Sequence, residues 1–304
     1  MDILDHLTIP SPLHQVRTAW SAAAAIELYI KRDDLIHPII SGNKWRKLSG
    51  ILSHYDKTTY REIITFGGAF SNHLVATAAS CAILKIPCTG IIRGEEPKQL
   101  NGVLKLCEMY GMRLTFVSRE EYKEHNRQLG IYEEKLFIPE GGACEQGTLG
   151  CFEVLREIEL KEISKVFVAC GTGTTIAGMS KFMDSTNDGT PLYGIQVLKG
   201  NGYIAKDLQD VYGIHNVTIY DEFHCGGYAK TSPELMDFIK EFTSETGILL
   251  DPVYTGKMMF GIFDLIQKDF FPPNSKILAI HTGGLQGIDG YEARYNLSLF
   301  NPNC

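Results

Sequence analysis

Residues 62–73 read EIITFGGAFSNH, a mostly apolar run followed by a double glycine and a polar turn. Residues 72–85 are rich in alanine and leucine, and Ser71 or Asn72 has a side chain of the kind that caps a helix N-terminus. An apolar run, a glycine turn and a helical pattern, in this order, are typical of a strand that leads into a helix. The stretch therefore predicts one strand, loop and helix unit of an α/β protein.

The same order recurs along most of the chain. Further strands are expected near residues 28–31, 86–93, 112–118, 136–139, 165–170, 192–198, 217–223 and 276–281, and further helices near 98–110, 120–128, 148–163, 174–183, 233–246 and 257–268. Residues 1–27 read as an irregular lead-in with room for one short helix. Alternating strands and helices are typical of parallel sheets with helices on both faces. We predict an α/β protein of two open parallel-sheet domains: a large one of residues 1–47 and 155–304, and a smaller one of residues 48–154 inserted in it.

The composition indicates a globular protein that acts on a small molecule. The 304 residues are 44% hydrophobic, and the formal net charge of −7 argues against nucleic acid and anionic membranes, which attract basic surfaces. No apolar run is long enough to span a membrane, and the N-terminus lacks the features of a signal peptide, so we expect a cytoplasmic protein. Eight cysteines occur without a C-x-x-C pair, and no histidine pair has metal spacing. Reduced thiols and no metal site are expected.

Four glycine loops each follow an apolar run, at residues 67–73, 141–147, 171–175 and 282–285. Ligands of open parallel sheets bind beyond the carboxyl ends of the strands. We therefore expect all four loops to contribute to one cleft.

The loop Gly171-Thr172-Gly173-Thr174-Thr175 follows a strand and opens a helix, so its N–H groups and hydroxyls can bind a phosphate. It does not match the dinucleotide fingerprint, because Ile176 stands where the third glycine is needed, and it lacks the Gly-Lys pair of a Walker motif. A nicotinamide oxidoreductase is disfavoured for this reason. A tight structural turn remains an alternative for the loop.

Lys44 lies within residues 41–47, a polar stretch expected to form a small turn after a strand. A partly desolvated lysine amine can form an imine with an aldehyde cofactor such as pyridoxal 5'-phosphate (PLP). A solvated surface lysine is the alternative. Ser71 and Asn72 can donate to a ligand or merely cap a helix, and Tyr254 can stack near a cofactor or belong to the core.

Motifs along nearly the whole chain resemble the 1-aminocyclopropane-1-carboxylate (ACC) deaminase / D-cysteine desulfhydrase family. They are KRDDL (31–35), GNKWRKL (42–48), GGAFSNH (67–73), PEGG (139–142), GTGT (171–174), DPVYTGK (251–257) and HTGG (281–284). The resemblance implies a PLP enzyme with the tryptophan-synthase β-like fold (PLP fold type II), usually a homodimer. It also implies Lys44 as the Schiff-base lysine, Asn72 beside the ring oxygen, residues 171–175 around the phosphate, and Ser71 and Tyr254 facing an amino-acid substrate.

Thr255 and Thr282 stand at the two positions that distinguish activities within this family. ACC deaminases carry Glu and Leu there, whereas D-cysteine desulfhydrases resemble this chain. The resemblance therefore implies a PLP-dependent lyase that converts D-cysteine to pyruvate, ammonia and hydrogen sulfide. ACC deamination to 2-oxobutyrate and ammonia, and a PLP-binding protein without turnover, remain alternatives. The chain departs from the family pattern at Ser41, Phe70 and Cys144.

Overall fold

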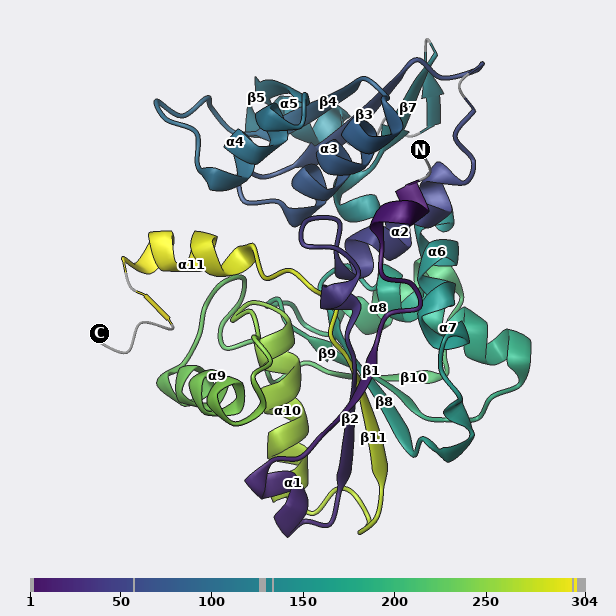
Figure 1. The fold of residues 1–304 in the computed structure, drawn as a ribbon, viewed down its shortest axis with the longest axis vertical. Helices are drawn as coiled ribbons and strands as arrows, with labels where there is room; N and C mark the ends of the chain where they lie inside the picture. Colours follow the sequence, from purple (N-terminus) through teal and green to yellow (C-terminus); the bar gives the residue numbers. More distant parts are fainter. Residues whose placement is uncertain (1–2, 57, 126–129, 133, 297, 300–304) are drawn as a thin grey trace. The chain divides into compact units, whose positions relative to one another are not determined.

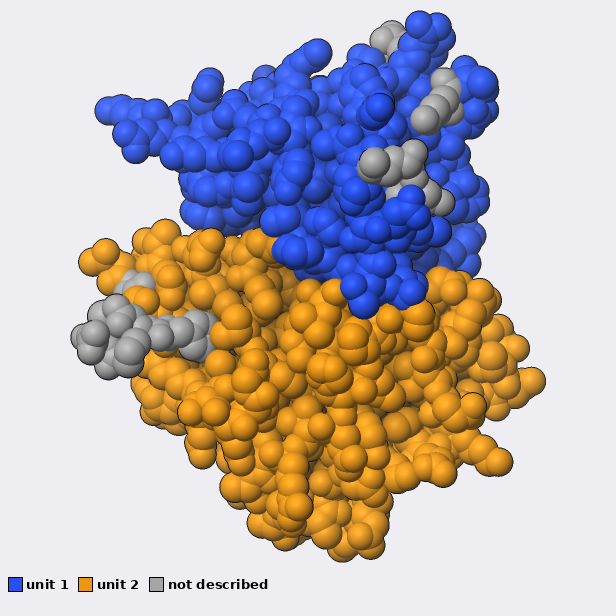
Figure 2. Space-filling view, viewed as in Figure 1, with its two compact units in different colours: residues 1–9, 36–151 blue, residues 10–35, 152–304 orange. Residues whose placement is uncertain are grey.

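The computed structural model describes residues 3–56, 58–125, 130–132, 134–296 and 298–299. Two compact units divide the chain, a smaller one of Met1–Ile9 with Ile36–Cys151 and a larger one of Pro10–Leu35 with Phe152–Cys304 (Figure 2). Residues 1–9 and 36–47 thus fall in the smaller unit and residues 152–154 in the larger one, whereas the sequence-based division places them the other way round. For residues 36–47 the reason is that helix α2 (Gly42–Leu52) buries Trp45 and Leu48 in the core of the smaller unit.

The smaller unit is built on a five-stranded sheet in the order β5-β4-β3-β7-β6 (Figure 1). Besides α2, its elements are η1 (Ile3–His6), β3 (Glu62–Gly67), α3 (Asn72–Leu84), β4 (Cys88–Arg93), α4 (Gly102–Met109), β5 (Arg113–Val117), α5 (Arg119–His125), β6 (Gly130–Tyr132), β7 (Lys135–Ile138), η3 (Glu140–Gly142) and most of α6 (Glu145–Arg156). Strand β3 pairs in parallel with β4 and β7, and β4 pairs in parallel with β5. The edge strand β6 is antiparallel to β7.

Helices cover both faces of this sheet. Ile63 and Ile92 pack with α2, α3 and α4 on one face. Ile64 and Phe66 pack with Tyr122 of α5 on the other face. Successive side chains of a strand point to opposite faces, so each strand supplies both cores.

The larger unit contains a six-stranded sheet in the order β1-β2-β11-β8-β9-β10 (Figure 1). Its elements are β1 (Leu13–Val16), α1 (Ala19–Ala23), β2 (Glu27–Lys31), η2 (Asp33–Leu35), η4 (Leu160–Glu162), β8 (Lys165–Cys170), α7 (Thr174–Thr186), β9 (Leu192–Gln196), α8 (Tyr203–Tyr212), β10 (Val217–Tyr220), α9 (Pro233–Thr246), α10 (Thr255–Gln267), β11 (Lys276–Ile280) and α11 (Gly287–Tyr295). Strands β2, β11, β8, β9 and β10 are parallel, whereas the edge strand β1 is antiparallel.

This sheet also separates two cores. Phe167 and Ala169 of β8 pack with α9 and α10, whereas Val166 and Val168 pack with α7 and α8 on the opposite face. Two parallel-dominated sheets with helices on both faces confirm the predicted α/β class. Parallel strands buried on both faces need nearly continuous apolar sequences, which is why most of them are evident from the sequence.

Some elements differ from the sequence-based expectation. The helix predicted over residues 148–163 ends at Arg156, and the next side chain, Glu157, lies 2.6 Å from Lys31 Nζ of the larger unit. The apolar pattern does not indicate β1, β6, α8 or α11. Strand β1 exposes most of its side chains, so its sequence lacks an apolar alternation. Residues 126–128, at the end of the helix predicted over 120–128, lie outside the described residues.

Within the described ranges, no helix is both long and apolar enough to cross a membrane. The same ranges contain no group of three or more His, Cys, Asp or Glu side chains that could hold a metal ion. The seven cysteines placed by the structure are free thiols.

Candidate functional site

The four glycine loops lie at carboxyl ends of strands, as their sequences predict. In the smaller unit, residues 67–73 and 141–147 follow β3 and β7, which are parallel neighbours. In the larger unit, residues 171–175 and 282–285 follow β8 and β11, which are also parallel neighbours. Parallel neighbours end at the same edge of a sheet, so each unit brings its own two loops together.

The loop of residues 171–175 leads from β8 into the N-terminus of α7. Its Gly173 is the N-cap and has a φ of 75°, a left-handed conformation that glycine adopts readily. The hydroxyls of Thr172 and Thr174 lie 3.1 Å apart. A helix N-terminus leaves its first N–H groups without acceptors inside the helix and carries a partial positive charge. The loop is therefore suited to bind an anion such as a phosphate ester.

Two tyrosines hold the beginning of this loop. The Tyr203 hydroxyl donates to the carbonyl oxygen of Gly171 at 2.5 Å, and burial raises the pKa of Tyr203 to about 12. A Cβ atom on Gly171 would lie only 3.1 Å from Cε1 of Tyr254. The Tyr254 ring thus packs against the anion-binding loop, which is where a ring that stacks near a cofactor is needed.

The carboxylate of Asp251 fixes the residues that precede α10. It accepts hydrogen bonds from the N–H groups of Val253, Tyr254 and Thr255 at 2.9, 2.7 and 2.9 Å, and from the Thr255 hydroxyl at 2.7 Å. The Thr255 hydroxyl oxygen in turn accepts the N–H of Asp251 at 3.0 Å. A hydroxyl has one proton to donate, and Asp251 receives it. In this arrangement Thr255 can meet a cofactor only as a hydrogen-bond acceptor.

Thr282 follows β11 and is 6% exposed, and its hydroxyl makes no hydrogen bond with the residues that the structure describes. The preceding His281 is anchored on both ring nitrogens. Its Nε2 donates to the carbonyl oxygen of Leu249 at 2.8 Å, and its Nδ1 accepts the N–H of Gly283 at 3.3 Å. Thr282 therefore occupies a fixed position with a hydroxyl that can both donate to and accept from a ligand.

Lys44 lies in the first turn of α2, and the sequence-based expectation of a small turn between elements is wrong on this point. Its Nζ donates to Oδ1 of Asn43 at 2.8 Å, and the side chain is half-buried. The side chain thus stands at the start of a helix of the smaller unit, with its amine held by the neighbouring asparagine.

Helix α2 contacts α6 through two glycines at which the helix backbones touch. A Cβ atom on Gly50 would lie 2.1 Å from the carbonyl oxygen of Gln146, and one on Gly150 would lie 2.0 Å from that of Arg46. Buried Lys47 adds a hydrogen bond from Nζ to the carbonyl oxygen of Gly141 at 3.0 Å. These contacts fix the helix of Lys44 against the loop of residues 141–147.

Ser71 and Asn72 stand at the start of α3. Ser71 is the N-cap, and its Oγ accepts the N–H of Leu74 at 3.4 Å, whereas Asn72 is the first residue of the helix. A Cβ atom on Gly67 would lie 2.7 Å from Ser71 Oγ, so the end of β3 has room only for glycine. Both polar side chains are half-buried at the loop that follows β3.

His73 is a buried, neutral imidazole behind these two residues. The Thr65 hydroxyl donates to the carbonyl oxygen of Ile138 at 3.1 Å, so it accepts from His73 Nε2, which lies 2.8 Å away. Burial, together with the positive charges of Lys44 and Lys47, lowers the pKa of His73 to about 3. His73 thus carries its proton on Nε2 and remains uncharged at neutral pH.

Each unit contains one of the two groups that a cofactor combining an aldehyde with a phosphate requires. The smaller unit supplies an amine in a helix first turn, and the larger unit supplies a helix N-terminus with two hydroxyls. Residues 5–283 match the pyridoxal-phosphate dependent enzyme family. The chain belongs to this family. PLP is therefore its cofactor, and the fold is the tryptophan-synthase β-like fold, PLP fold type II.

Individual relatives show which members of this family the chain resembles. The chain is 32% identical to the bifunctional D-cysteine desulfhydrase/1-aminocyclopropane-1-carboxylate deaminase of Arabidopsis thaliana, over 92% of this chain and 77% of the relative. A solved ACC deaminase homologue superimposes with a TM-score of 0.77 at 29% identity, covering 95% of this chain and 94% of that one. Threonine deaminase isoform 2 of Solanum lycopersicum has a TM-score of 0.70 at 19% identity, covering 92% and 81%, and shows the shared fold alone. The resemblance to the ACC deaminase / D-cysteine desulfhydrase family is confirmed.

Sequence reasoning did not indicate Asp251, Tyr203 or Lys47 as supports of the candidate site. Asp251 lies in the quoted motif DPVYTGK, and an acid a few residues before a helix is a recognisable capping signal. Tyr203 and Lys47 act on loops that are distant in sequence, at Gly171 and Gly141. No local pattern reveals such contacts.

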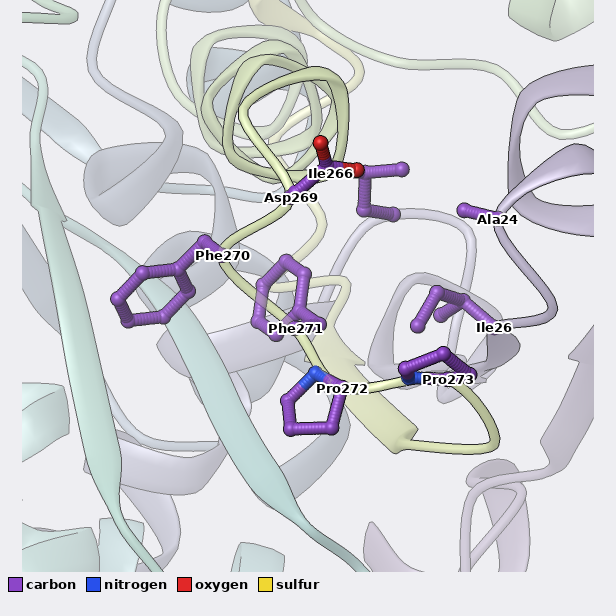
Figure 3. A pocket seen from close by; sticks show the side chains of 8 residues that line it. All are labelled: Ala24, Ile26, Ile266, Asp269, Phe270, Phe271, Pro272 and Pro273. Carbon is purple, nitrogen blue, oxygen red and sulfur yellow. The ribbon is translucent and has the colours of Figure 1, made fainter.

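The larger unit also has a surface pocket of about 410 Å³, which Figure 3 shows. Its lining includes Ile26 and Pro273, which precede β2 and β11. It therefore lies at the amino ends of these strands, at the opposite edge of the sheet from the glycine loops. Exposed Phe270 and Asp269 leave it open to solvent, and we assign it no role in the reaction.

Proposed function

We propose that this PLP enzyme removes the β-substituent of D-cysteine, giving pyruvate, ammonia and hydrogen sulfide. The observation that carries the proposal is the chemistry of positions 255 and 282, which hold threonine hydroxyls. No carboxylate is available at either position to keep the cofactor ring nitrogen protonated. An unprotonated ring withdraws electrons less strongly. It therefore suits D-cysteine, which carries a good leaving group, better than ACC, whose cyclopropane ring must be opened.

Each polar group has a part in this proposal. Lys44 would hold the cofactor through its amine, and the same amine would take the proton from Cα of the bound substrate. The loop of residues 171–175 would bind the phosphate, and Asn72 the ring oxygen. Bound PLP supplies an electron sink for the charge that develops at Cα. Ser71 and Tyr254 would orient the substrate, with Ser71 on its carboxylate.

The overall reaction consumes one water molecule for each substrate. The Cα–H and Cβ–S bonds break and the sulfur leaves as hydrogen sulfide. Cβ then gains a proton, and water hydrolyses the C–N bond to give pyruvate and ammonia. A thiol has a pKa of about 8.5, so its conjugate base leaves without strong acid assistance.

The hydrogen bonds favour Thr282 over Thr255 as the hydroxyl that meets the ring nitrogen. The Thr255 proton is donated to Asp251 at 2.7 Å. Thr282 has its hydroxyl proton available, since no described residue accepts it. Phe70, 45% exposed beside Ser71, would border the substrate and is an apolar departure from the family pattern.

ACC deamination is the second candidate activity. It is supported by the name of the Arabidopsis relative, which states both activities for that protein. PLP binding without turnover is a third possibility that the same experiment distinguishes. A homodimer and a cytoplasmic location remain predictions, to be checked by light scattering and by cell fractionation.

The test is to measure sulfide and 2-oxoacid after adding D-cysteine, L-cysteine or ACC separately to the purified holoenzyme. Sulfide and pyruvate from D-cysteine alone support the proposal. Formation of 2-oxobutyrate from ACC, without sulfide from D-cysteine, would replace it by the second candidate. A cofactor absorption band without product from any substrate would indicate binding alone. Lys44→Ala should lose the covalent cofactor adduct that borohydride reduction traps in the native protein, while an exposed control, Lys240→Ala, should retain it.

A further inference from the structure

The ammonium group of Lys257 is enclosed by backbone carbonyl oxygens of the larger unit. The side chain is 0% exposed, and its Nζ donates to the carbonyl oxygens of Val197, His224 and Gly227 at 3.1, 2.9 and 2.9 Å. An ammonium has three donors and no acceptor, so all of its hydrogen-bonding capacity is used. The carbonyl groups form a cage around a single positive charge.

This position is unfavourable for a lysine on general grounds. Lys257 lies in the first turn of α10, where the helix dipole disfavours a cation, and burial removes its charge from water. Burial lowers the pKa of Lys257 to about 8, although Cys225 and Asp251 act in the opposite direction. The amine is therefore still protonated at neutral pH. The carbonyl cage offsets the cost of burial, and an apolar side chain would leave these carbonyl oxygens without their ammonium donor.

The caged charge joins segments that are distant in sequence. Val197 directly follows β9, whereas His224 and Gly227 belong to the connection between β10 and α9. Residues 225–227 have φ values of 52°, 90° and 130°; two of them are glycines, and only Cys225 has a φ that is uncommon for a residue with a side chain. Lys257 binds the carbonyl oxygens of His224 and Gly227, which lie on either side of Cys225 and Gly226.

The cage also adjoins the anion-binding loop. Val197 donates its N–H to the carbonyl oxygen of Cys170 at 3.1 Å, and Cys170 is the last residue of β8 before that loop. One helical turn before Lys257, Tyr254 packs on Gly171. The ammonium thus links the beginning of α10 to the end of β9. The end of β9 contacts Cys170 and the residue before α10 contacts Gly171, and β8 passes into the anion-binding loop between these two residues.

We propose that Lys257 is a built-in monovalent cation, whose ammonium takes the place of a potassium or ammonium ion in a cage of backbone carbonyls. Carbonyl oxygens are the groups that replace the hydration shell of such ions in proteins. The native protein then has no need of a bound monovalent ion at this place. Truncation of the side chain creates a site that such an ion can occupy. The inference does not depend on the proposed reaction.

The test compares thermal unfolding midpoints in potassium, ammonium and tetramethylammonium chloride at equal ionic strength and neutral pH. The native protein should unfold at the same temperature in all three salts. Lys257→Ala should unfold roughly 5–10 °C lower in tetramethylammonium, because carbonyl groups are left unsatisfied. Potassium or ammonium, which fit the vacated space, should restore at least about half of that loss.

Two further variants make the result specific. Lys257→Met fills the space with an apolar side chain and should lose stability in every salt without recovery. Lys268→Ala removes an exposed lysine that pairs with Asp264 at the end of the same helix, and should show no salt-specific change. Equal unfolding midpoints of Lys257→Ala in all three salts, or native stability of that variant, would overturn the proposal.

If Lys257→Ala does not fold, a variant that removes only the charge tests the same proposal. Lys257→Gln keeps two N–H donors but no charge, and it should also unfold at a lower temperature than the native protein. An unchanged midpoint for Lys257→Gln would show that the charge is dispensable. A rise of the thermal unfolding midpoint of the native protein in potassium alone would also contradict the proposal, because it would show that the native protein binds potassium although Lys257 is present.

Discussion

Asp251 and Thr255 bind each other through three hydrogen bonds across the start of α10. The Asp251 carboxylate accepts the N–H and the hydroxyl of Thr255 at 2.9 and 2.7 Å, and the Thr255 oxygen accepts the N–H of Asp251 at 3.0 Å. Both residues are 0% exposed, so water does not replace these bonds when one is lost. The pair determines where Tyr254 lies and leaves Thr255 without a proton for a ligand.

Asp251→Asn should destabilise the protein markedly. One carboxylate oxygen accepts from residues 253 and 254 and the other from Thr255, so the amide keeps one of these acceptors and turns an NH2 group toward the donors of the other. We expect the free energy of unfolding to fall by about 3 kcal/mol, measured by urea denaturation. Asp237→Asn, at an exposed position of α9, is the matched control and should be neutral. A loss below about 1 kcal/mol for Asp251→Asn would show that the carboxylate is not essential to this cap.

We expect Thr282→Val to lower the activity with little change in stability, and Thr255→Val to lower the stability. Thr282 donates to no described residue, so Thr282→Val should change the free energy of unfolding by less than about 0.5 kcal/mol. Its kcat should fall about 10-fold or more if the hydroxyl meets the cofactor ring, because a lost hydrogen bond worth about 1.4 kcal/mol in the transition state slows a reaction about 10-fold. Thr255→Val should lose about 1–3 kcal/mol of stability, because Asp251 loses its bonded hydroxyl. Equal effects of the two variants on stability would contradict this assignment.

The variant that carries the ACC deaminase residues, Thr255→Glu with Thr282→Leu, should be destabilised in this chain. Glu at position 255 places a second carboxylate beside Asp251 at a fully buried position, and two like charges there cannot both ionise easily. The midpoint of thermal unfolding should fall by several degrees, and adding Asp251→Asn should recover part of the loss. Unchanged stability together with unchanged elimination from D-cysteine would show that neither position controls the ring nitrogen.

The sequence predicts the architecture well because the parallel strands are apolar over their whole length. The strands near residues 62–66, 165–170 and 276–281 appear with ends shifted by at most about one residue. The loop of residues 171–175 is also found where expected, because a strand, a glycine turn and a helix form a local pattern. The edge strand β1 lacks such a pattern, since most of its side chains, on both faces, are exposed.

The supports of the candidate site are not predictable in the same way. Lys257 binds the carbonyl oxygen of Val197, and Lys47 binds that of Gly141, across long stretches of chain. A lysine gives no sequence signal for a carbonyl acceptor that far away. Lys44 likewise lies in a helix instead of the expected turn: α2 begins at Gly42, and its contact with α6 at Gly50 depends on residues far along the chain.

Gly150→Ala should prevent the smaller unit from reaching its native packing. The new Cβ atom would lie 2.0 Å from the carbonyl oxygen of Arg46, a backbone atom that cannot move away without shifting α2. We expect a loss of about 3 kcal/mol or more, or insoluble protein. Gly102→Ala, where no atom lies within 4 Å of the added Cβ, is the control and should be neutral or slightly stabilising. Normal stability of Gly150→Ala, measured by urea denaturation, would refute the direct contact between α2 and α6.

Acidification should destabilise the protein through His73. Its pKa is about 3 in the folded protein and 6.5 in the absence of burial, so below pH 6.5 the unfolded chain binds a proton that the folded protein does not. The stability from this group is fully present above pH 6.5 and is lost as the pH falls toward 3. At pH 5 the loss is about 2 kcal/mol. Urea denaturation at pH 7 and pH 5 should show this loss in the native protein and in the exposed control His54→Gln, but not in His73→Gln. An equal loss in His73→Gln would place the acid sensitivity in another residue.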